Sequence, residues 1–228
     1  MKKKIFKHDN RTNEYPHIGT MKSIVPDWWK ESERFLGGVP QFIPEINKGI
    51  KLCIPFLDSL TSGYYIPLSK DIIVKQAEDG IPQLSWGPGG ELPPVRERKA
   101  PKMPTPAGYS TDNFAWQIEP SFHLPPGYSL LFTSPMNRFD LPFITASAII
   151  DADVPMFPGN APFFLKDGFE GVIPQGTPIA QVIPFKRESW KLEHTIGLTQ
   201  EAEKNRTRSN AKIFGWYKNN VWHKKSYD

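Results

Sequence analysis

The stretch that decides the fold runs from residue 143 to residue 153. It reads Phe143-Ile144-Thr145-Ala146-Ser147-Ala148-Ile149-Ile150-Asp151-Ala152-Asp153. Its first eight residues are apolar or small and include several β-branched side chains, a composition typical of a strand. We therefore predict a strand over residues 143–150 that ends where the two aspartates begin.

Short apolar stretches lie on both sides of this strand. The sequence predicts further strands over residues 114–118, 128–133, 161–165, 171–174 and 179–185, separated by proline and glycine turns. Strands repeated about every 8–12 residues with turn signals between them indicate an all-β sandwich or barrel. The chain also contains 24 prolines, and proline inside a helix breaks it. The predicted fold class is therefore mainly β.

The flanking regions predict a mixture of elements. Strands are expected at 50–54, 64–68 and 71–74, and Cys53 is expected to be a buried thiol because it lies in the first of them. Residues 80–108 are rich in glycine and proline and predict a surface connection. A short helix over 26–35 would bury Trp28, Trp29 and Phe35, and a polar helix is expected over 199–211.

These predictions divide the chain into three parts. Residues 1–39 would form an N-terminal arm and short helix, and residues 40–187 a core domain. Residues 188–228 would form a C-terminal helix and a tail in which aromatic residues alternate with lysines.

Composition excludes several classes of protein. A single cysteine excludes a disulfide framework and a cysteine-based zinc finger, and the five histidines show no metal-ligand spacing. No apolar run is long enough to span a membrane, and no apolar stretch follows Met1-Lys2-Lys3-Lys4 as in a signal peptide. We expect a cytoplasmic protein, in the host cytoplasm or the virion if the gene is viral, and no resident metal or other cofactor.

Positive charge is concentrated at the C-terminal end. Residues 186–228 contain ten Lys and Arg against five Asp and Glu, whereas the whole chain has a net charge of only +4. A nucleic-acid groove across the body of the protein is therefore not expected. The tail, with Trp216, Tyr217 and Trp222 among lysines, could contact nucleic acid or could be an arm that packs on the protein itself or on a neighbouring subunit.

Asp151 and Asp153 form the sharpest local feature. Residues i and i+2 of a strand share a face, so both carboxylates would point the same way at a strand end. Such a pair can bind a divalent ion or activate a water molecule. The alternative is a solvated strand end with turn-forming aspartates.

Three short motifs follow one another along the chain. They are Leu124-Pro125-Pro126-Gly127-Tyr128, Ala148-Ile149-Ile150-Asp151-Ala152-Asp153 and Ile173-Pro174-Gln175-Gly176-Thr177-Pro178-Ile179-Ala180-Gln181. Their order and spacing resemble the trimeric dUTPase and dCTP deaminase superfamily. The resemblance covers roughly residues 50–185. It implies a β-clip, dUTPase-like barrel-sandwich of short strands that assembles as a homotrimer.

The resemblance also implies roles for individual residues. Asp151 matches the family's water-activating base, and Gln181 matches a phosphate or scaffold contact. Ser134 and Arg138 lie where the family has an adjacent Arg-Ser pair that grips phosphates, but here they are not adjacent. Asp153 would help to hold Mg²⁺ through water. The family's glycine-rich C-terminal phosphate lid is missing, which indicates a retained fold with eroded catalytic motifs.

A second resemblance covers the whole chain. The segments at 24–30, 51–59 and 176–187 resemble a family of tailed-phage and bacterial proteins of unknown function. A phage or prophage origin is therefore expected, and no activity is implied by this resemblance.

Two functions follow as hypotheses. The first is a non-catalytic β-clip protein that acts as a structural or partner-binding module, with a nucleotide-like molecule or a protein as its ligand. The alternative is a Mg²⁺-dependent nucleotide pyrophosphatase in which Asp151 is the general base and Arg138 and Gln181 contact the phosphates.

Overall fold

The structure is a computed structural model that describes residues 4–10, 15–38, 47–89, 92–98, 102–211 and 215–228. The chain divides into two compact units that alternate along the sequence. The first comprises Met1–Ile24 and Gly63–Arg187, and the second comprises Val25–Ser62 and Glu188–Asp228. The predicted boundary after residue 39 and the N-terminal residues 1–3 lie outside the described residues.

The first unit consists almost entirely of antiparallel strands, which confirms the mainly-β prediction. A five-stranded sheet has the order β11 (Ala148–Asp151), β9 (Tyr128–Thr133), β14 (Pro178–Lys186), β3 (Tyr64–Pro67) and β2 (Gly19–Thr20). A four-stranded sheet has the order β10 (Phe143–Thr145), β12 (Gly159–Lys166), β7 (Tyr109–Ile118) and β6 (Val95–Glu97).

Two smaller sheets and a short 3-10 helix complete this unit. One sheet contains β13 (Gly171–Ile173), β4 (Ile72–Gln76) and β5 (Pro82–Ser85), and the other pairs β1 (Lys7–Asp9) with β8 (Ser121–His123). The 3-10 helix η1 (Met21–Ile24) follows β2 directly. Strands β5 and β6 lie in a region that was predicted to be a connection without strands.

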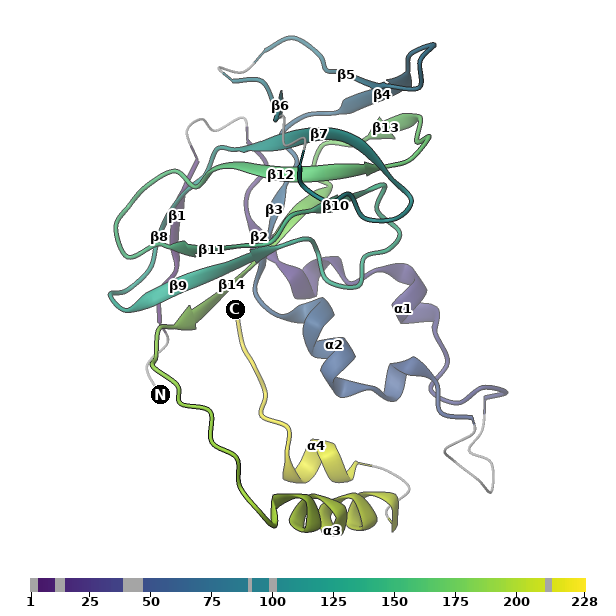
Figure 1. Ribbon diagram of the computed structural model, residues 1–228, viewed down its shortest axis with the longest axis vertical. Helices are drawn as coiled ribbons and strands as arrows, with labels where there is room; N and C mark the ends of the chain where they lie inside the picture. The colour runs from purple at the N-terminus through teal and green to yellow at the C-terminus, as the bar shows by residue number, and fades with distance from the viewer. Residues whose placement is uncertain (1–3, 11–14, 39–46, 90–91, 99–101, 212–214) are drawn as a thin grey trace. The chain divides into compact units, whose positions relative to one another are not determined.

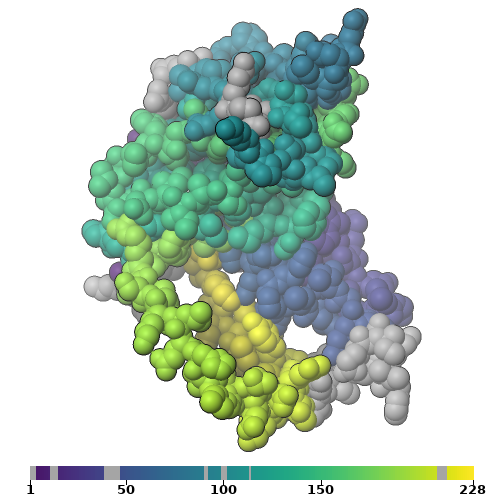
Figure 2. Space-filling view, in the orientation of Figure 1, coloured from purple at the N-terminus to yellow at the C-terminus, as the bar shows by residue number. Residues whose placement is uncertain are grey.

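The main core lies between the two larger sheets. Figure 1 shows β7 and β12 in one layer and β9 and β14 in another, and the space-filling view shows these teal and green segments as one dense mass (Figure 2). Trp116 of β7 stacks on Phe163 of β12, with ring centroids 3.6 Å apart. The Trp116 Nε1–H donates to Thr145 Oγ1 at 3.0 Å, and the Thr145 hydroxyl donates to the Ile179 carbonyl at 2.6 Å. Thr145 thus links the two layers through buried hydrogen bonds.

The predicted strand at 143–150 is in fact two strands in two different sheets. β10 pairs with β12, whereas β11 pairs with β9 of the other sheet. Between them the Ala146 N–H donates to the Pro162 carbonyl at 2.7 Å. The small residues Ala146 and Ser147 allow the chain to cross between layers here, which a composition-based prediction cannot distinguish from a continuous strand.

The second unit is helical. It contains α1 (Asp27–Glu31), the 3-10 helix η2 (Ile50–Leu52), α2 (Ile54–Thr61), α3 (Leu198–Ala211) and α4 (Trp216–Asn220). The prediction of α3 is confirmed. The predicted helix at 26–35 is real but ends at Glu31; it buries Trp29 and leaves Trp28 more exposed.

The predicted strand at 50–54 is wrong. Its residues form η2 and the start of α2, and Cys53 is exposed at the boundary between the two helices. Proline is favourable in the first turn of a helix, and Pro55 occupies that place in α2. The alternation at 50–54 was too short to distinguish a strand from a helix start. None of the described helices is long and apolar enough to cross a membrane.

Candidate functional site

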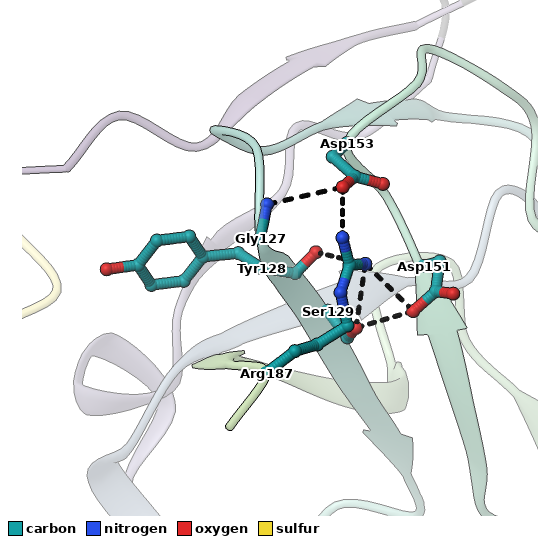
Figure 3. Close-up of polar contacts among 6 residues, drawn as sticks. All are labelled: Gly127, Tyr128, Ser129, Asp151, Asp153 and Arg187. Atoms are coloured by element: carbon teal, nitrogen blue, oxygen red, sulfur yellow. Dashed lines mark hydrogen bonds and ion pairs between the residues drawn. The ribbon is translucent and has the colours of Figure 1, made fainter. Parts of the chain in front are cut away.

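The two aspartates predicted from the sequence lie at one end of the five-stranded sheet. Asp151 is the last residue of β11 and pairs in register with Ser129 at the start of β9. Its Oδ1 accepts a hydrogen bond of 2.6 Å from the Ser129 hydroxyl. Asp153 lies two residues further on and accepts a hydrogen bond of 3.3 Å from the Gly127 N–H (Figure 3).

Arg187 joins these carboxylates. It directly follows β14, which pairs with β9, and its own N–H donates to the Gly127 carbonyl at 2.9 Å. The Nη1 atom lies 3.0 Å from Asp151 Oδ1, and Nη2 donates to Asp153 Oδ2 (Figure 3). Nη1 also contacts the Tyr128 carbonyl and the Ser129 hydroxyl, both at 3.3 Å. We call the group of Ser129, Asp151, Asp153 and Arg187 the Arg187 clamp.

The clamp stabilises the ionised form of both aspartates. The Ser129 hydroxyl and then the Arg187 guanidinium lower the pKa of Asp151 below its ordinary value. For Asp153, Arg187 and then the Gly127 N–H lower the pKa. An efficient general base has a pKa near the working pH, and a carboxylate with a lowered pKa is a weaker base than an ordinary one.

The resemblance implies Mg²⁺ for a hydrolase, and Arg187 already places a positive charge beside both carboxylates. Magnesium is bound by carboxylate oxygens that are free to face it. Here one oxygen of each carboxylate, Asp151 Oδ1 and Asp153 Oδ2, is bonded to the positive guanidinium of Arg187. Among the described residues, no group of three or more histidine, cysteine, aspartate or glutamate side chains is placed to hold a metal ion.

The other predicted residues lie beyond the opposite end of β9. Ser134 follows the last residue of β9, and Arg138 lies in the loop after it. Gln181 is buried in β14, where its Oε1 accepts a hydrogen bond of 2.8 Å from the Met136 N–H. Gln181 thus fastens this loop to the sheet.

Arg138 is held within the protein rather than extended toward solvent. Its Nε and Nη2 atoms donate to the carboxylate of Asp140 at 2.8–3.1 Å, and Nη1 donates to the Ile24 carbonyl at 3.4 Å. Only 12% of the Arg138 side chain is exposed. A bidentate contact with a carboxylate uses the same donors that would grip a phosphate.

A pocket with a volume of about 300 Å³ lies beside this loop. Ser134, Arg138, Tyr109 and Phe143 are among the residues that line it. Asn137, also in the lining, has a φ of 58°, which makes it the one described non-glycine residue with a positive φ. The volume of this pocket is at the lower limit for small-molecule sites.

The five predicted residues therefore fall into two groups. Asp151 and Asp153 lie at the start of β9, and Ser134, Arg138 and Gln181 gather past its end. Ser129 and Ser134 are five residues apart, which corresponds to about 17 Å along an extended strand. Within one chain the carboxylates and the candidate phosphate contacts do not form a single site.

Sequence reasoning did not assign a role to Arg187. The residue directly follows β14, and a basic residue after a strand has no distinctive pattern of its own. The signal lies in the pairing of β14 with β9, which places Arg187 next to Gly127 and Ser129.

A scan against models of known protein families finds no match to this chain, and a search of curated proteins finds no relative.

Proposed function

We propose that this protein is a non-catalytic module of the β-clip type that acts by binding a partner, first of all other copies of itself. The observation that carries the proposal is the Arg187 clamp. It engages Asp151, the residue that matches a catalytic base, together with Asp153. The fold is used here as a scaffold, and the family's chemistry is not retained.

The state of Arg138 supports the same conclusion. Phosphoryl chemistry depends on positive charge aimed at the phosphates. The Arg138 guanidinium is already bonded to Asp140, and Ser134 is not adjacent to it. The motif that would bind phosphates thus stabilises the loop instead.

The free edge of the five-stranded sheet supports self-association. β11 is the outermost strand next to β9, and its Ile149 side chain is 70% exposed. Val154, Met156 and Phe157 follow within a few residues and are also exposed. An edge strand with exposed apolar side chains can pair with another chain. The resemblance implies a trimer, so the proposed occupant is a second copy of this chain.

The test is the mass of the full chain in solution. One chain has a mass of 26.0 kDa, and the proposal expects an assembly of three. Ile149→Asp should shift the protein toward the monomer, because it places a charge in the interface. Val172→Asp is the matched control, since Val172 is also exposed on the edge strand β13 of a different sheet.

Either of two results would contradict self-association. One is a monomer at every concentration, and the other is an equal loss of assembly in both variants. In the first case the partner would be a different protein, or a ligand in the pocket lined by Ser134 and Arg138.

A further inference from the structure

The Asp58 carboxylate of α2 binds two residues of the C-terminal tail. The Trp222 Nε1–H donates to the two Asp58 oxygens at 3.1 and 2.9 Å. Lys225 Nζ lies 2.5 Å from Asp58 Oδ2 and 5.7 Å from the centre of the Trp222 ring. Trp222 and Lys225 are thus occupied in packing within the second unit, and we call this contact the Asp58 anchor.

Trp216, Tyr217 and Lys218 of the tail line a pocket. α3 and α4 lie side by side in this unit (Figure 1). A pocket of about 230 Å³ is formed between α4, α3, η2 and the first turn of α2. Its lining includes Lys48, Cys53, Pro55, Trp216, Tyr217 and Lys218.

The charged residues described in the lining of this pocket are of one sign. They are Lys48 and Lys218, and neither Asp nor Glu is among the described lining residues. The Lys218 side chain makes no hydrogen bond or ion pair within the described part of the chain. The whole second unit has twelve Lys and Arg against ten Asp and Glu, a small excess of positive charge.

The aromatic residues supply a second kind of recognition. Trp216 is half-buried and Tyr217 is exposed, and both are held by α4. Because α4 fixes the backbone of both residues, less conformational freedom is lost when a flat ligand stacks on their rings. Stacking on aromatic side chains combined with contacts between lysines and phosphates is the usual way of binding unpaired bases.

We propose that this pocket binds an unpaired nucleobase together with its phosphate, with the base against Trp216 and Tyr217 and the phosphate beside Lys218. The pocket is smaller than typical sites for drug-sized ligands, so it takes one base rather than a longer stretch. The source of the base is a free nucleotide or a single strand, and both share this chemistry. The proposal does not depend on the function proposed for the first unit.

The experiment measures binding of a labelled thymidine oligonucleotide to the full chain by fluorescence anisotropy, with thymidine monophosphate as a competitor. Affinity should fall as salt rises, because phosphate contacts release counterions. Trp216→Ala should weaken binding on the order of tenfold. Trp216→Phe should recover most of that loss, which separates a stacking role from a failure to fold.

The charged residues give a matched pair of variants. Lys218→Ala should weaken binding and make its salt dependence shallower. Lys224→Ala removes the same charge from the same tail outside the pocket lining and should have little effect. Competition by thymidine monophosphate would identify a free nucleotide as sufficient, whereas binding of the oligonucleotide without competition would identify a strand.

Three results would overturn the proposal. The first is no binding of either probe. The second is binding by Trp216→Ala and Lys218→Ala that equals that of Lys224→Ala. The third is equally tight binding of an acidic peptide of the same charge, since that would show attraction by charge without recognition of a base.

Discussion

Arg187 Nη1 lies 3.0 Å from Asp151 Oδ1. This contact connects the residue after β14, the central strand of the five-stranded sheet, to the edge strand β11. The same guanidinium bonds to Asp153. This single cation therefore separates two carboxylates that would otherwise repel each other at a strand end.

Replacing Arg187 with alanine should lower the melting temperature by a few degrees. The variant leaves the negative charges of Asp151 and Asp153 without their cation and removes contacts to β9. Thermal unfolding followed by circular dichroism at neutral pH measures the effect. Lys75→Ala is the control, because Lys75 is an exposed cation on β4 without an ion pair in the described structure. Equal melting temperatures for both variants would show that the clamp does not stabilise the fold.

The clamp should also make stability depend on pH in the acid range. The pKa values of Asp151 and Asp153 are lower in the folded protein than their ordinary value of 3.8. A carboxylate with a lowered folded pKa contributes stability above its unfolded pKa, and this contribution is lost as the pH falls through the folded pKa.

The matched measurement compares the wild type with the double variant Asp151→Asn, Asp153→Asn. The difference in melting temperature should be constant above the ordinary carboxyl pKa of 3.8 and should narrow as the pH falls below it. A difference in melting temperature that widens as the pH falls would show that the ionised forms of Asp151 and Asp153 do not stabilise the fold.

Thr145→Val should destabilise the protein by about 1–3 kcal/mol, because buried groups lose their hydrogen-bond partner. The Trp116 Nε1–H and the Ile179 carbonyl both bond to the Thr145 hydroxyl. Thr145→Ser keeps the hydroxyl and should lose less. Urea denaturation gives the free energies of unfolding. If the Val variant is as stable as the Ser variant, the hydrogen bonds of the Thr145 hydroxyl do not stabilise the core.

Asp58→Ala should release the C-terminal tail. Without the carboxylate, Trp222 and Lys225 lose their common partner, and the tail should be cut faster by trypsin at Lys224 and Lys225. The control is Asp27→Ala, which removes a more exposed carboxylate of the same unit. Equal rates of cleavage in the two variants would show that the Asp58 anchor does not hold the tail.

Local pattern predicted part of this fold well. The strand at 128–133 corresponds to β9, and the polar helix at 199–211 corresponds to α3. Both depend on residues that lie next to one another in the sequence. The split of 143–150 into β10 and β11 was missed because it depends on two different partner strands.

The candidate site shows the same limit. The sequence identified Asp151 and Asp153 as a pair, and the structure places both at one strand end. Their partner Arg187 is 34 residues beyond Asp153 and reaches them only because β14 pairs with β9. Chemistry assigned from a motif alone therefore overlooked the cation that decides what the carboxylates can do.

The central claim is that the β unit binds without catalysing. The most direct test is a hydrolysis assay of the pure full chain against all nucleoside and deoxynucleoside triphosphates with Mg²⁺. The account predicts no turnover above that of an Asp151→Asn variant. Turnover of one nucleotide by the wild type that is lost in Asp151→Asn, with an unchanged melting temperature, would contradict it and make the protein a pyrophosphatase.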